Sequence, residues 1–413
     1  MSSEFRGRTP LLAVGALLLL GLGWRVFSLG MADHYARSQP ERALFWRSDH
    51  PEALLRLAEK QAAAKQWPLA EKNAKAALRA NRLDGRALRV LAQAAEAGGQ
   101  PSQALKLFQQ AVTLAPRDVT SQAWLLRSAL QRRDPVAAVT HMDALLRLRP
   151  QLLDSLQSQA EILAVNDVTR PEWVKALLKA PPWRAAYLQR LGASPLPSED
   201  LSPLFAALGR QAELSPEEIN PWLERLRREN RMPQAYLTWA NLLPEAQRKR
   251  LGNVFDGGFE MPPEEHSGPF AWRSGSPNGS LVLWTETRGT VGESSYSVQF
   301  EGVRTPFADL AQALVLPPGD WQLQWRAKAE NLDSPRGLIW RIHCEPDGRI
   351  LAESEPMKGR FDWQAMEQAF TVPGDCIGQT LTLMIPARIP AETLINGTLW
   401  LDEVRIQPAI SQP

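Results

Sequence analysis

The stretch that decides the fold of this chain is residues 85–118, GRALRVLAQAAEAGGQPSQALKLFQQAVTLAPRD. Apolar and small residues recur in it at helical spacing in two blocks, which Gly98 and Gly99 separate and Pro116 ends. Residues 51–84 before it and 119–152 after it have the same length of roughly 34 residues and keep the same register. A period of this length over three consecutive units predicts pairs of helices stacked into a solenoid.

Small side chains occupy the positions where neighbouring helices of such a stack must approach each other. In the middle unit these positions are Ala92, Ala104 and Ala111, with Phe108 between the last two. The other two units repeat the frame with Leu57, Ala58, Ala70, Ala77, Leu125, Ala138, Leu145 and Pro150. The frame resembles the tetratricopeptide repeat, and residues 32–50 fit a half-repeat that caps the array. The resemblance implies an all-α solenoid that binds protein segments.

The resemblance also implies which side chains line a concave groove along the first helices of the three units. They are Glu52, Leu55, Glu59, Arg86, Arg89, Gln93, Glu96, Thr120 and Arg127. Charges of both signs at these positions favour a peptide or protein segment over a polyanion as the partner, and complementary charges would set its register. The alternative is a solvated helix face that has no partner.

Upstream of the array lies the only long apolar run in the sequence. Residues 9–29 reach the roughly 20 residues that cross a bilayer, with Arg25 close enough to one end to extend to the interface. Arg6 and Arg8 precede the run, so the positive-inside rule places the N-terminus in the cytoplasm and the bulk of the chain in a bacterial periplasm. We expect a single-pass inner-membrane anchor within residues 1–31. The alternative is a signal peptide that is cleaved near Asp33.

Downstream of the array the helical pattern continues without the repeat frame. Prolines interrupt residues 153–250, where a remnant of the repeat keeps Ala235 and Trp239 at second-helix positions. From about residue 251 the apolar period changes to two, which predicts an all-β sandwich over residues 251–413. The expected strands lie at residues 280–287, 296–300, 313–316, 321–327, 337–344, 368–372, 380–385 and 399–406. The predicted domains are 1–31 (stub and anchor), 32–152 (half-repeat and three repeats), 153–250 (degenerate helices) and 251–413 (sandwich).

Three short motifs of this last domain resemble the galactose-binding-like jelly roll of many carbohydrate-binding modules. They are NVFDGGFE at residues 253–260, FAW at 270–272 and LWLDEV at 399–404. The resemblance implies a structural calcium ion beside the first and last strands, with Glu260 and Asp402 at the positions of its carboxylate ligands. The alternative is that both are ordinary strand or edge charges. Asp256 stands where the family more often has asparagine, so this loop is expected to differ.

Tryptophans of the predicted sandwich are the candidates for sugar binding, because the apolar faces of sugars stack on exposed aromatic rings. They are Trp272, Trp284, Trp321, Trp325, Trp340, Trp363 and Trp400. Aromatic residues on alternating strands more often pack in the core, so we expect most of them to be buried.

Composition and motifs narrow the class of function. With 47 Lys and Arg against 45 Asp and Glu, the chain has no broad basic field for nucleic acid. The five histidines lack zinc-site spacing, and neither a nucleophile elbow nor a phosphate-binding loop occurs, so we expect no enzyme. A glycosidase pair of carboxylates stays open, because its members come together from anywhere in a fold. Cys344 and Cys376 are expected to form a disulfide in an oxidising compartment, with two free thiols as the alternative.

Together these expectations describe a multidomain protein with an N-terminal transmembrane helix, an all-α tetratricopeptide solenoid and an all-β jelly-roll sandwich. We expect a periplasmic scaffold or assembly protein without a cofactor, apart from the calcium ion, which binds other envelope proteins through its repeats. Its resemblance to repeat proteins of exopolysaccharide systems implies a part in polysaccharide synthesis or export. The alternatives are a glycan-binding protein that acts through the jelly roll and a glycoside-active enzyme.

Overall fold

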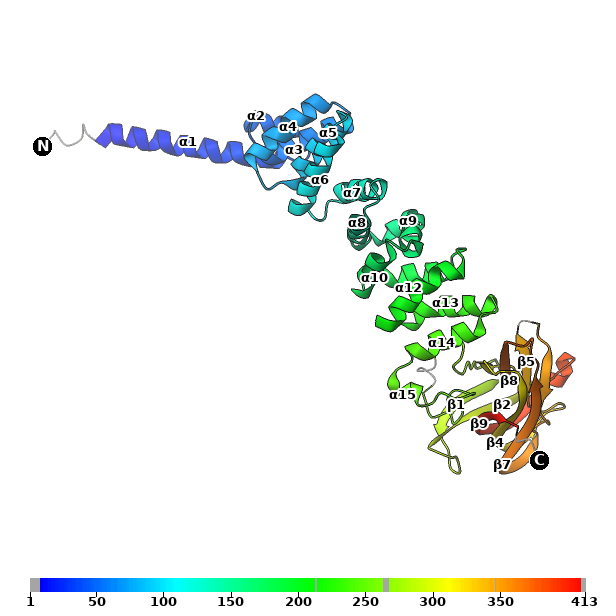
Figure 1. The fold of residues 1–413 in the computed structure, drawn as a ribbon. Helices are drawn as coiled ribbons and strands as arrows, with labels where there is room; N and C mark the ends of the chain where they lie inside the picture. Colours follow the sequence, from blue (N-terminus) through cyan, green and yellow to red (C-terminus); the bar gives the residue numbers. More distant parts are fainter. Residues whose placement is uncertain (1–7, 212–213, 263–266, 346, 410–413) are drawn as a thin grey trace. The chain divides into compact units, whose positions relative to one another are not determined.

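The structure is a computed structural model that describes residues 8–211, 214–262, 267–345 and 347–409, with side chains from residue 14 onward. Its contacts divide the chain into two compact units, Met1–Trp183 and Arg184–Pro413. The predicted multidomain architecture of helical repeats followed by a β-sandwich is confirmed (Figure 1). The division at 183 and 184 groups the last helices with the sandwich, and the domain boundaries proposed from the sequence stay predictions.

The described part of the first unit is helical. Its helices are α1 (Arg8–Tyr35), α2 (Pro40–Trp46), α3 (Pro51–Ala63), α4 (Trp67–Ala80), α5 (Gly85–Ala97), α6 (Pro101–Leu114), α7 (Val119–Gln131), α8 (Pro135–Leu148), α9 (Leu153–Val165) and α10 (Arg170–Leu178), with a 3-10 turn at Pro150–Leu152. Helix α3 packs against α4, α5 against α6 and α7 against α8, so each pair is one of the predicted repeats. Helix α1 is long and apolar enough to cross a membrane, a test that a signal sequence also passes.

Backbone geometry recurs at both ends of the first helix in each repeat. Side chains cap α3, α5 and α7 by accepting a hydrogen bond from a backbone N–H of the first turn, and these are His50 (3.2 Å), Asp84 (3.0 Å) and Asp118 (3.0 Å). The turn that follows each helix contains a residue with positive φ, and these are Lys65 (57°), Gly99 (72°) and Arg133 (55°). The repeat is therefore defined by its helix start and its turn as well as by its apolar frame.

Close helix contacts explain the small residues of the frame. A Cβ atom at Gly85 would lie 2.6 Å from the carbonyl oxygen of Ala111. The close approach of α5 and α6 therefore requires a residue without a side chain at this position. Ala92, Ala104 and Ala111 are fully buried, as the frame requires. Phe108 of α6 stacks on Trp124 of the next repeat, with ring centroids 4.3 Å apart. Each repeat thus buries an apolar face against its neighbour.

The second unit begins with five helices: α11 (Arg184–Gly192), α12 (Ser198–Gln211), α13 (Pro216–Arg228), α14 (Met232–Leu242) and α15 (Glu245–Arg248). The pair α13 and α14 has the geometry of a repeat. Ser215 precedes α13 and donates its backbone N–H to Glu218, and Asn230, with φ of 63°, closes the turn at the same distance along the chain as Gly99 does after Asp84. Ala235 and Trp239 are buried on α14, at their predicted second-helix positions.

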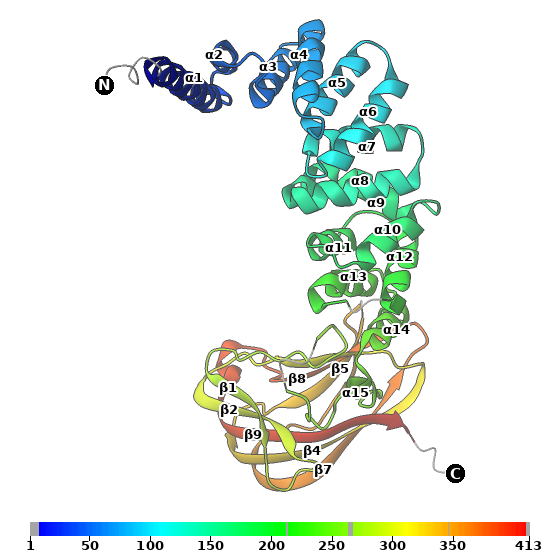
Figure 2. The same ribbon diagram turned by 90° about the vertical axis from the view of Figure 1, so that its left-hand side faces the viewer.

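Two antiparallel sheets follow. Their strands are β1 (Ser280–Glu286), β2 (Ser294–Arg304), β3 (Leu310–Leu314), β4 (Gly319–Asp333), β5 (Ile339–Glu345), β6 (Ile350–Glu353), β7 (Gly359–Val372), β8 (Gly378–Met384) and β9 (Leu394–Pro408), with a 3-10 turn at Pro390–Thr393. The strand orders are β1-β2-β9-β4-β7 and β3-β8-β5-β6. The five strands of the first sheet are labelled in Figure 2. The crossing connections make this a jelly roll, as predicted.

The strands predicted from the sequence omit β6 and the first half of β7. Side chains of both segments are exposed or half-buried. In β7 the alternation of Phe361, Trp363 and Ala365 with polar residues was a strand signal that the prediction missed. Between the sheets, side chains such as Phe259, Tyr296 and Leu323 form a continuous core. A disulfide joins Cys344 to Cys376, as predicted, with 5.6 Å between the Cα atoms.

Helix α14 contacts the sandwich through Trp239, at the position where a repeat contacts the next repeat. Trp239 occupies the position of Phe108 and packs against Phe255 and Phe270, with ring centroids 5.0 and 5.6 Å away. Arg227 adds an ion pair of 2.9 Å with Glu345, next to the disulfide. The start of the jelly roll thus covers the apolar face that a further repeat would otherwise cover.

Candidate functional site

Most of the charged side chains predicted to line the repeat groove pair with one another across repeats. Glu52 of α3 lies 2.8 Å from Arg86 of α5, and Glu96 of α5 lies 3.2 Å from Arg127 of α7. Arg89 binds both Glu59 of α3 and Asp118, the cap of α7. These pairs place the predicted residues on one face of the array. They also show that its charges are largely neutralised from within.

Electrostatics at the first of these pairs favour the charged forms. Burial raises the pKa of Glu52, but hydrogen bonds and charges from Arg86 and Arg56 outweigh burial and hold that pKa below its ordinary value. The hydrogen bonds that Arg86 donates to Asp84, and to a smaller extent those to Glu52, raise the pKa of Arg86. The pair therefore contributes to the joint between two repeats more than to a surface that attracts a partner.

The remaining predicted groove residues differ in access. Leu55 is fully buried in a cluster with Leu54, Ala77 and Ala87, so it does not line an open groove, because its side chain fills the space between helices. Gln93 is half-buried, while Glu96 and Thr120 are exposed. Arg127 has 60% of its side chain exposed. The accessible part of the predicted face is therefore its end at α7.

An apolar pocket of about 370 Å³ lies at this end of the array. Its lining comes from α7, α8, the 3-10 turn and α9 and combines leucines with polar side chains. The leucines are Leu126, Leu130, Leu145, Leu152 and Leu156, and the polar residues are Arg127, Gln131, Ser155 and Gln159. A mainly apolar lining with a few polar groups is the usual composition of a ligand-binding pocket.

The two predicted calcium ligands lie close together beside the loop that joins β1 to β2. Glu260 accepts hydrogen bonds from the backbone N–H groups of Glu293 and Ser294, at 3.0 and 3.3 Å. Asp402 is fully buried on β9 and accepts one from Val291 at 2.8 Å. Burial raises the pKa of Asp402, and the charge of Glu260 acts in the same direction. A cation between the two carboxylates would offset both effects.

This arrangement fits calcium in its carboxylates, because hard cations take oxygen ligands. Further ligands would have to be backbone carbonyl groups. Among the residues that the structure describes, no group of three or more His, Cys, Asp or Glu side chains converges on a metal position. Calcium at Glu260 and Asp402 therefore stays a prediction. Asp256 has a structural role instead. Its carboxylate accepts hydrogen bonds from the backbone N–H groups of Glu260 and Met261 and so shapes the loop before them.

Two of the seven tryptophans lie on the outer face of the five-stranded sheet. Trp272, Trp321, Trp325 and Trp340 are buried in the core, and Trp284 packs partly against it. Trp363 of β7 and Trp400 of β9 are half-buried, on the two sides of β4. Arg326 and Lys328 of β4 lie over their rings, at 5.4 and 5.1 Å from the ring centroids. These two indoles are the ones of the seven on this outer face, where the loop that joins β1 to β2 contacts Trp363 and accepts its indole N–H at the carbonyl oxygen of Arg288, at 3.0 Å.

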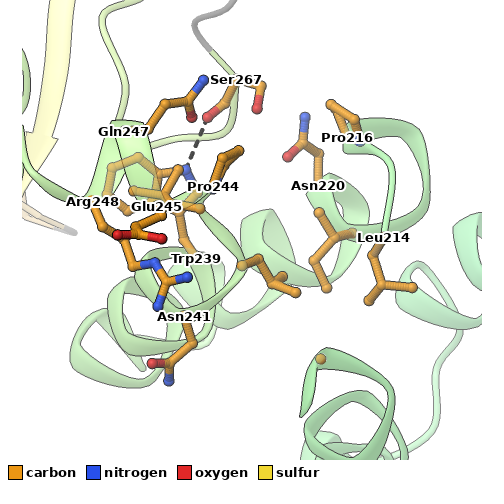
Figure 3. A pocket seen from close by; sticks show the side chains of 14 residues that line it. Leu214, Pro216, Asn220, Trp239, Asn241, Pro244, Glu245, Gln247, Arg248 and Ser267 are labelled. Carbon is orange, nitrogen blue, oxygen red and sulfur yellow. Dashed lines mark hydrogen bonds between the residues drawn. The ribbon is translucent and has the colours of Figure 1, made fainter. Parts of the chain in front are cut away.

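A larger cavity of about 630 Å³ lies among α12 to α15 and is shown in Figure 3. Trp239 forms part of its wall and donates its indole N–H to the carbonyl oxygen of Ser267 at 2.9 Å. Glu245 and Arg248 are the charged residues of its lining, and the others are apolar or amide side chains together with the hydroxyl of Ser267.

The tetratricopeptide repeat profile matches residues 55–119 and 90–152, which confirms the repeats. No curated protein matches the chain significantly. A family 4 and a family 16 carbohydrate-binding module each align at 14% identity over 38% of this chain and 99% of their own, with TM-scores of 0.27 and 0.26. A family 61 module in complex with β-1,4-galactotriose aligns at 18% identity over the same shares, with a TM-score of 0.26.

Sequence reasoning missed the leucine pocket. Leu126 and Leu130 are spaced by one helical turn on α7, but Leu156 comes from a segment that no longer follows the repeat frame. The pocket exists because α9 packs against α8, a contact that the frame does not predict. The alternation of β4 was the signal for the outer sheet face: Trp325 and Ala327 are buried, so Arg326 and Lys328 must point outward.

Proposed function

We propose that this protein is a membrane-anchored scaffold of the bacterial envelope, which binds a segment of another envelope protein through its repeats. The observation that carries the proposal is the leucine pocket beside Arg127, at the accessible end of the repeat face. A partner segment would place an apolar side chain against Leu130 and Leu156 and a carboxylate beside Arg127. Burial of that side chain would supply affinity, and the charge would set orientation.

The place of this scaffold in the cell is the second element of the proposal. Helix α1, long and apolar enough to span a bilayer, supports an inner-membrane anchor with the bulk of the chain in the periplasm. The disulfide between Cys344 and Cys376 is in keeping with an oxidising compartment. By its resemblance to repeat proteins of exopolysaccharide systems, the partner is expected among the proteins that synthesise or export an envelope polysaccharide.

Site-specific photo-crosslinking in living cells tests the binding surface. A photoreactive residue replaces Gln131 of the pocket lining in the full chain, and the matched control carries it at Leu83, which is 75% exposed outside the pocket. We expect discrete crosslinked products from position 131 and not from position 83. The product should disappear when Leu156→Asp is added, because the carboxylate places a charge among the leucines.

Two outcomes contradict the proposal. Equal crosslinking from positions 131 and 83 would mean that the pocket has no specific occupant. Products from position 131 that persist with Leu156→Asp, while the variant stays folded by circular dichroism, would mean that the partner touches position 131 without using the pocket. Mass spectrometry of the product then tests the polysaccharide connection separately from the site.

Glycan binding by the jelly roll is a second candidate function, and Trp363 and Trp400 favour it. Neighbouring strands lie about 4.8 Å apart, so two indoles on either side of β4 present aromatic surface roughly 10 Å apart. Arg326 and Lys328 between them offer hydrogen-bond donors to sugar hydroxyl groups. An extended glycan across the strands could contact both rings.

Affinity electrophoresis through gels that contain the envelope polysaccharide of the source cells tests this second function. We expect retardation of the full chain, and Trp363→Ala or Trp400→Ala should each weaken it by about 2 kcal/mol, roughly 30-fold, if the indole is an anchor. Leu281→Ala, at an exposed position on β1 of the same sheet, is the matched control. Retardation that is equal in all variants would exclude this face as the glycan site.

A further inference from the structure

A cluster of aromatic side chains lies where α1 meets the repeat array. Trp24 and Phe27 of α1 contact Trp46 of α2, with ring centroids 6.0 and 5.7 Å apart, and Phe45 lies 5.6 Å from Trp46. The cluster is open to its surroundings, because Phe45 is 82% exposed and Trp24 is 63% exposed. Adjacent exposed rings of this size indicate an apolar partner.

Helix α1 is continuous with the first packed element of the array. It runs without a break to Tyr35, and Ala32 is fully buried. One turn later Ala36 packs in a cluster with Ala43 of α2 and Ala53 of α3. Trp24 precedes Ala32 by about two turns, or roughly 12 Å along the helix. The end of the apolar helix therefore holds α2 at a fixed place beside it.

The surroundings of the cluster match the boundary of a bilayer. Indole rings concentrate at the level of the lipid headgroups, and arginines near them reach lipid phosphates. Arg25 of α1, Arg42 of α2 and Arg37 between these helices are exposed. The acidic residues of the same segments are paired: Asp33 with His50, Glu41 with Lys60 and Asp49 with Arg47. The surface is thus aromatic with a basic edge.

We propose that α2 is an interfacial helix whose Phe45 and Trp46 lie in the headgroup region of the bilayer that α1 spans. The occupant of the exposed aromatic surface is then lipid, and the first repeat is held directly at the membrane surface. The inference rests on the membrane anchor of the proposed function. It adds that the anchor and the start of the array form one membrane-bound unit instead of a tether and a free domain.

Spin-label accessibility in vesicles of phosphatidylethanolamine and phosphatidylglycerol tests the proposal on the full chain. The native cysteines are bonded to each other, so one introduced cysteine carries the label. The test variant is Phe45→Cys, and Ser48→Cys, three residues further on, is a second probe of the same region. Leu18→Cys reports on the span and Leu83→Cys on a surface away from the cluster. All four positions are exposed, so the core is not disturbed.

We expect the label at position 45 to collide more with oxygen and less with a water-soluble nickel chelate than the label at 83. Its depth should lie between those of positions 18 and 83. The label at 18 could lie in lipid while the labels at 45 and 48 are as accessible to nickel as the label at 83. That result would overturn the interfacial helix and leave the anchor intact. A label at 18 that is itself in water would overturn both the anchor and the inference.

Discussion

Gly85 is the residue at which α5 and α6 come closest. A Cβ atom there would lie 2.6 Å from the carbonyl oxygen of Ala111 and 2.8 Å from the Cβ atom of Ala115. Gly85→Ala should therefore lower the free energy of unfolding by about 1 to 3 kcal/mol, because the second helix must shift. Gly98→Ala is the control, since its new Cβ atom would approach no neighbour closer than 3.4 Å. Urea unfolding followed by the helical circular dichroism signal measures both, and equal stabilities would contradict the prediction.

Glu52 makes the joint between the first two repeats sensitive to acid. Because its pKa is lowered in the folded chain, its contribution to stability is present above its ordinary pKa of about 4.3 and is lost as pH falls through the folded value. Glu52→Gln should cost about 1 kcal/mol or less near pH 7, and the cost should be smaller near pH 3, because the carboxylate is lost as pH falls through its lowered pKa. Urea titrations at both pH values test this. Glu71→Gln, which removes an exposed pair with Lys75 inside α4, should show a smaller change.

Asp402 is the residue on which calcium binding should depend. If the ion binds Asp402 and Glu260, added calcium raises the melting temperature of the full chain and a chelator reverses the rise. Asp402→Asn should abolish the calcium-dependent part, whatever it does to stability without calcium. Glu330→Gln, at an exposed carboxylate on β4 of the same sheet, should leave that part unchanged. No calcium-dependent shift in the unmodified chain would end the calcium prediction.

Turns between the two helices of a repeat are the elements that carry stored strain. Gly99 adopts positive φ without cost, whereas Lys65 and Arg133 adopt it at the equivalent places with a Cβ atom. Lys65→Gly and Arg133→Gly should each stabilise the chain by up to about 1 kcal/mol, and Gly99→Ala should destabilise it by a similar amount. Differential scanning calorimetry measures the three variants. Destabilisation by both glycine substitutions would mean that these side chains matter more than the backbone.

The second helix of a repeat packs against two different kinds of neighbour in this chain. Phe108 of α6 meets the next repeat, and Trp239, at the same place in α14, meets Phe255 and Phe270 of the sandwich. The pattern of small and large residues indicated that α14 belongs to a repeat. It did not indicate what α14 packs against, because an apolar face has no preference between a helix and a loop of suitable shape.

At the scale of the whole molecule, the proposed membrane anchor depends on α1. We expect the chain to stay with the inner membrane through a carbonate wash. Leu18→Arg should release it or block its insertion, because an arginine at the centre of a span costs roughly 2.5 to 3.5 kcal/mol. Leu83→Arg, outside α1, is the control. Recovery of the unmodified protein in the soluble periplasmic fraction, with an N-terminus near Asp33, would contradict the anchor.

The repeats, the change to β-structure near residue 251 and the disulfide were determined by the sequence itself. Each depends on local chemistry: small residues at a fixed period, turn residues between alternating strands, and two cysteines in one domain. The positions of Trp363 and Trp400 were not, because inward and outward aromatic residues look alike until the neighbouring strands are known. The leucine pocket and the pairing of Arg86 and Arg89 within the array were decided by the tertiary structure alone. They depend on which segments pack side by side, and that is set by the burial of whole faces and not by any one stretch of residues.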